Sequence, residues 1–102
     1  MFIAFVKKET DENIKLKIAV SLRKLLETIE GYPVAQSYNK IALTAYVRKA
    51  TVSDAFNAKS IPNSLTLFLI IEAMGFSITD FAKVYDSIEN SDLIEFKKIL
   101  LK

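Results

Sequence analysis

The fold expected for this sequence depends most on the stretch from Ser37 to Asn57, SYNKIALTAYVRKATVSDAFN. Small or apolar side chains recur through it at helical spacing, at Ile41, Ala42, Ala45, Val52, Ala55 and Phe56. The pattern predicts two short helices, over 38–45 and 49–57, with Ser37 as the N-cap of the first. Only residues 46–48 separate them, and a connection of about three residues is typical of a helix-turn-helix.

Helical signals continue toward the N-terminus. Thr10 or Asp11 can cap a helix that should run to about Glu30. Gly31 and Pro33 then stop it. The inward stripe of this helix is expected to consist of Ile14, Ile18, Leu22, Leu25 and Ile29. Its solvated face is expected to carry Lys15, Lys17, Arg23, Lys24 and Glu27.

Three more helices are expected downstream, over 64–74, 78–87 and 92–101, the last within the C-terminal segment 91–101. Each begins at a local cap: Asn63 or Ser64, the capping-box variant Ser77–Asp80, and Asn90 or Ser91. Gly75 is suited to end the first of the three.

A different pattern occupies the N-terminal segment 1–8. Met1 to Val6, MFIAFV, is β-prone, apolar on both alternating faces and too short for a globular helix, so it predicts a short β-strand. A single strand leaves its backbone groups unpaired and needs a partner. That partner is either Pro33–Tyr38 of this chain or a second copy of the protein.

Composition narrows the class of protein. A chain of 102 residues is the size of one domain, and two Gly and two Pro favour long helices, so the expected fold class is all-α. No Cys and no His exclude disulfides, thiolate zinc sites and the commonest general base. We expect no enzyme, no cofactor and no metal. The absence of a leader and of an apolar run near ~20 residues predicts a cytoplasmic protein without membrane contact.

Charge is nearly balanced. Fourteen Lys and Arg oppose 12 Asp and Glu, a net charge of +2 that permits nucleic-acid binding without requiring it. Any argument for DNA binding therefore depends on where the cationic side chains lie.

From Ser37 to Phe81 the chain resembles the lambda-repressor/Cro-like (XRE-type) helix-turn-helix family, without a gap. The matching stretches are Ser37–Ala42, Tyr46–Arg48, Thr51–Ser53, Pro62, Thr66–Leu67, Glu72–Ser77 and Asp80–Phe81. The sequence departs from the family pattern in having Tyr46 and Ala58 where relatives carry Gly, Phe56 where many carry Glu, and a longer connection over 31–36. The resemblance implies a bundle of five or six helices with 49–57 as the recognition helix.

Carried over by position, the resemblance implies that Lys49, Ala50, Ser53 and Asp54 reach base edges in the major groove. Lys49 suits guanine, Ala50 a thymine methyl and Asp54 the cytosine amino group. Asn57 follows them further along the helix. Phosphate contacts are expected from Ser37, Tyr38, Asn39, Arg48, Thr51, Lys59 and Ser60. Ordinary alternatives remain open for four of the contact residues. Arg48, Lys49 and Lys59 would also suit a solvated face, and Tyr38 would also suit a surface aromatic packed on the connection over 31–36.

The function that this resemblance implies is a sequence-specific, double-stranded-DNA-binding transcriptional regulator, a homodimeric repressor of a bacterium or phage. Dimer contacts would come from the N-terminal strand, the last helix or both, and apolar residues in excess within Leu65–Ile71 also suggest a dimer surface. Two alternatives remain open. One is a helix-turn-helix protein-interaction module that does not bind DNA, and the other is the antitoxin partner of a toxin.

Overall fold

The computed structural model describes residues 11–29 and 34–101, and every regular element within these ranges is an α-helix. The six helices are α1 (Asp11–Glu27), α2 (Val34–Ala45), α3 (Lys49–Phe56), α4 (Ser64–Ala73), α5 (Ile78–Ser87) and α6 (Asn90–Leu100). The all-α class is therefore confirmed for this part of the chain. The predicted strand Met1–Val6 and the stop residues Gly31 and Pro33 lie outside the described residues.

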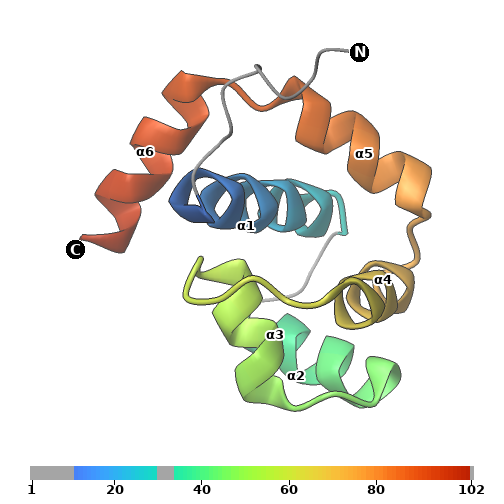
Figure 1. The fold of residues 1–102 in the computed structure, drawn as a ribbon. Helices are drawn as coiled ribbons and strands as arrows, with labels where there is room; N and C mark the ends of the chain where they lie inside the picture. The colour runs from blue at the N-terminus through green and yellow to red at the C-terminus, as the bar shows by residue number, and fades with distance from the viewer. Residues whose placement is uncertain (1–10, 30–33, 102) are drawn as a thin grey trace.

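Helix α1 runs through the middle of the fold and packs against α3, α5 and α6 (Figure 1). The short helices α2 and α3 pack on each other, and α4 packs on both α2 and α5. One apolar cluster joins Leu22 and Leu25 of α1 to the buried residues of α2, α3, α4 and α5. A second cluster joins Leu16 and Ala19 to α6 through Phe96.

The sequence pattern predicted the face of α1 that packs in the first cluster and missed the face that packs in the second. Ile18, Leu22 and Leu25 are buried as expected, but Leu16 and Val20 are buried as well. The expected solvated face is also partly wrong. The Lys17 ammonium lies 4.5 Å from the centre of the Tyr85 ring, a cation–π contact between α1 and α5.

Helix α2 begins at Val34, one turn before the predicted start at Tyr38. Residues 34–38 are therefore helical, which makes the expectation of strand character there wrong. The longer connection expected over 31–36 is likewise helical from residue 34 onward. The physical reason is that a proline blocks a helix arriving from its N-terminal side but not one starting after it, and Ala and Gln are good helix formers.

Three helices end in the same left-handed turn. After α2, α3 and α4, the residues Tyr46 (φ 58°), Ala58 (φ 58°) and Gly75 (φ 89°) adopt positive φ. In each case the N–H of the following residue donates to the carbonyl of the residue five positions before it, at 3.1, 2.9 and 3.2 Å, as in a Schellman motif. Tyr46 and Ala58 thus adopt a left-handed conformation that usually favours glycine.

Within residues 11–29 and 34–101, no single helix is both long and apolar enough to cross a membrane. By length and composition alone, one pair passes together, α4 with α5, which is bent by 101° at its break.

Replacing Tyr46 with Gly should stabilise the protein. The Tyr46 side chain is 94% exposed, so little packing is lost, while the left-handed conformation costs an L-residue about 1–2 kcal/mol. The greater conformational entropy of Gly in the unfolded chain offsets part of this relief. The free energy of unfolding, measured by urea denaturation, should therefore rise by roughly 0.5–1 kcal/mol. The reverse change, Gly75→Ala, meets open space and should lose a similar amount because only backbone strain opposes it. Equal signs for the two variants would contradict this account.

Acid should weaken the cap of α5. The Ser77 N–H donates to the Asp80 carboxylate at 2.8 Å, and the Asp80 N–H donates to the Ser77 hydroxyl at 3.1 Å. The backbone bond from Ser77 is the main reason that the pKa of Asp80 is lowered, helped by the bond with the Ser77 side chain and by Lys83. Because the pKa of Asp80 is lower in the folded protein, the ionised carboxylate stabilises the fold at pH values above its ordinary pKa of 3.8. This stabilisation is lost as the pH falls.

Urea denaturation between about pH 2 and pH 6 should therefore show a steeper acid loss in the unmodified protein than in Asp80→Asn. The amide keeps an acceptor but carries no titrating charge. Parallel pH profiles for the two proteins would show that the cap contributes nothing to acid sensitivity.

Candidate nucleic-acid interface

The N-terminal end of α3 is open to solvent. Arg48 is its N-cap, in extended conformation with φ −72° and ψ 146°, and its side chain does not cap the helix. The first helical hydrogen bonds run from Thr51 and Val52 to the Arg48 carbonyl, at 3.1 and 3.2 Å. The N–H groups of Lys49 and Ala50 precede these bonds, and both residues are exposed. Such an end suits an anionic oxygen.

The opposite face of α3 fixes this end in place. Val52, Ala55 and Phe56 are 0%, 1% and 0% exposed, and they pack into the cluster shared with α1 and α2. The Phe56 ring also lies 4.8 Å from the Tyr38 ring of α2, measured between centroids. Ile41 and Val52, two of the apolar positions at helical spacing, are both buried. The exposed side of α3 is thus carried on a firmly packed helix.

Cationic side chains gather in this part of the chain. Residues 34–63 carry four Lys and Arg side chains and a single carboxylate, Asp54, although the whole chain is only at +2. Arg48, Lys49 and Lys59 are exposed and form no ion pair with any described residue. Their charges are therefore not neutralised within the fold.

The other predicted contact residues divide by exposure. Ala50, Asn39 and Ser60 are exposed, whereas Thr51, Ser53 and Asp54 are half-buried along the sides of α3. Asn39 lies in the second turn of α2, away from the helix start where it was expected. Arg48, Lys49 and Ala50 thus form an exposed group at the start of α3.

Two predicted contact residues lie inside the fold. Ser37 and Tyr38 are 4% and 8% exposed, because α2 starts one turn earlier, at Val34, and both side chains are covered within the fold. The expectations that Ser37 is the N-cap of this helix and that both side chains are open to phosphate are wrong. Burial raises the pKa of the Tyr38 phenol, against the lowering effects of the Arg23 charge and a hydrogen bond with Asn57. The phenol therefore stays protonated and belongs to the internal packing.

Asn57 is also held within the fold. Its side-chain nitrogen donates to the Ser53 carbonyl at 2.8 Å, and its side-chain oxygen accepts from Arg23 Nη2 at 2.7 Å. Asn57 therefore finishes α3 and ties it to α1. Both of its polar atoms have partners without any DNA.

Arg23 is the residue that the sequence pattern did not reveal. Its Nε donates to the Phe56 carbonyl at 2.8 Å, and its guanidinium lies 4.9 Å from the centre of the Phe96 ring in α6. One side chain of α1 thus satisfies the end of α3 and contacts α6. An arginine on an expected polar face gives no local signal for contacts with residues more than thirty positions away.

No family model matches this chain, and no curated protein and no solved structure shows significant similarity to it.

Arg23→Met should destabilise the protein by about 1.5–3 kcal/mol, because it keeps the apolar stem but removes two charge-assisted donors from half-buried acceptors. Lys24→Met is the matched control on the same helix. Lys24 lies 3.9 Å from Asp92 as a partly exposed ion pair, which predicts a loss below about 1 kcal/mol. Urea denaturation followed by circular dichroism measures both, and equal small losses would show that the Arg23 bonds do not hold α3.

Proposed function

We propose that this protein is a lambda-repressor/Cro-like regulator that binds a specific double-stranded DNA sequence as a homodimer and represses transcription. The observation that carries the proposal is the group of exposed, unpaired cations Arg48, Lys49 and Lys59 around a firmly packed α3. A positive, exposed helix end on a rigid support is what entry into the major groove requires.

Roles within the interface follow from exposure. Lys49 and Ala50 lead into the groove, and Ser53 and Asp54 follow along the helix. Arg48, Lys59 and Ser60 lie at the two ends of α3, where phosphates flank a groove-bound helix. Thr51 lies between the residues that lead into the groove and the residues at the ends of α3. Ser37, Tyr38 and Asn57 have internal roles and are left out of the proposed contact set.

A homodimer is best formed through α6. Ile94, Ile99 and Leu101 at this end are 55%, 57% and 86% exposed, and α6 packs on α1 across the fold from α2 and α3 (Figure 1). A partner placed there leaves the N-terminal end of α3 uncovered. Two such helices would need to lie about 34 Å apart to enter successive major grooves.

A second candidate, a helix-turn-helix that binds another protein, is favoured by one observation. Leu43 and Tyr46 are 71% and 94% exposed near the turn between α2 and α3. Large exposed apolar side chains suit a protein partner better than a phosphate backbone. The unpaired cations make DNA the preferred ligand.

Selection of bound DNA from a random pool tests the proposal. Lys49→Ala should cost about 1–3 kcal/mol and relax preference at one base pair, because it removes a base-edge donor. Lys59→Ala should weaken all sequences alike and reduce the salt dependence by about one charge. Lys83→Ala, which changes an exposed lysine on α5, is the matched control and should change neither. If the unmodified protein enriches no sequence at low salt, the protein-binding candidate replaces this one.

A further inference from the structure

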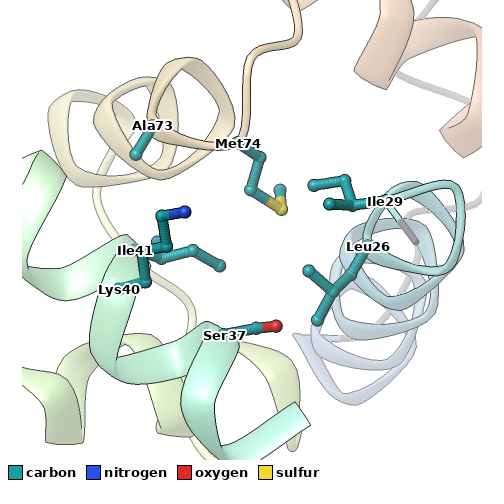
Figure 2. Close-up of a pocket in the computed structure, with 7 residues that line it drawn as sticks. All are labelled: Leu26, Ile29, Ser37, Lys40, Ile41, Ala73 and Met74. Atoms are coloured by element: carbon teal, nitrogen blue, oxygen red, sulfur yellow. The ribbon is translucent and has the colours of Figure 1, made fainter. Parts of the chain in front are cut away.

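A hollow of about 140 Å³ lies between the end of α1, the middle of α2 and the end of α4 (Figure 2). Its apolar lining consists of Leu26, Ile29, Ile41, Ala73 and Met74. None of these residues belongs to the proposed DNA-contact set. Nothing in the sequence pattern indicated a pocket here, because its walls come from three separate helices.

One polar side-chain group points into this hollow without a described partner. Ser37 is 4% exposed, and its hydroxyl makes no hydrogen bond to any residue that the structure describes. Figure 2 shows the Ser37 oxygen directed toward the space between Leu26, Ile41 and Met74. A hydroxyl that loses its hydrogen bonds to water on burial and gains none in return destabilises a fold. A ligand able to hydrogen-bond with Ser37 would therefore be favoured.

We propose that this hollow binds a small aromatic molecule that carries a single hydroxyl group, a ligand of the size of phenol. An engineered cavity of roughly 150 Å³ with apolar walls binds benzene, so the space suits one ring. The ring would contact Leu26, Ile41 and Met74, and its hydroxyl would pair with Ser37. The proposal does not depend on DNA binding.

The lining selects against the other occupants. Among the described side chains that line the hollow only Ser37 and Lys40 are polar, and Lys40 is exposed at its edge. The side chains therefore offer a water few of the two to four partners it needs. Benzene would fit but would leave the Ser37 hydroxyl unpaired. A charged ligand would lose its hydration among apolar side chains.

Methionine labelling provides a direct test, because the chain contains only two methionines, Met1 and Met74. With ¹³C-methyl methionine, phenol should shift the Met74 signal and saturate with a dissociation constant of about 1 mM or tighter, as expected for a ligand of roughly seven heavy atoms. Met74→Leu assigns the two signals. Benzene should bind about fivefold more weakly, which is the value of one hydrogen bond.

Ser37→Ala should remove the preference for phenol over benzene while leaving benzene affinity unchanged. Ala73→Leu should abolish binding of both by filling the hollow, and Ala82→Leu, at an exposed position of α5, is the matched control. Thermal unfolding confirms that each variant folds. An unsaturated shift up to about 10 mM phenol, or a preference that survives in Ser37→Ala, would overturn the proposal.

Discussion

Helix α1 is held between two apolar clusters, and the remaining helices depend on it for their placement. Leu22 and Leu25 face the cluster that gathers α2 to α5, and Leu16 and Ala19 face α6. Each fully buried leucine stabilises the fold by about 1.5–3 kcal/mol, so a helix buried on two sides carries much of the total. Arg23 adds a polar link from the same helix to the end of α3.

The sequence predicted the helices best where a side chain marks the boundary. Helix α5 spans Ile78–Ser87 as predicted, because Ser77 and Asp80, only three residues apart, form a reciprocal cap that the sequence reveals. Asn63 likewise accepts from the Thr66 N–H at 2.8 Å at the start of α4. The start of α6 was less well predicted, since Glu89 rather than Asn90 or Ser91 is its N-cap.

The candidate site was predictable only in its exposed half. Arg48, Lys49 and Lys59 are exposed because the inward positions of α3 follow a helical period visible in the sequence. Ser37 was misplaced because a Ser before an apolar run is a typical N-cap, whereas α2 begins at Val34. The role of Arg23 could not be predicted, since it bonds residues 33 and 34 positions away, and such contacts exist only once α1 and α3 have packed.

The uneven placement of charge gives the molecule a direction. Residues 34–63 carry four cations and one carboxylate, whereas residues 78–101, on the far side of α1, carry five carboxylates and three lysines (Figure 1). A molecule of small net charge can therefore still have an electric dipole across α1. In the field of a polyanion this dipole would rotate α3 toward the anion before contact, which raises the association rate at low ionic strength and loses its effect as salt screens the field.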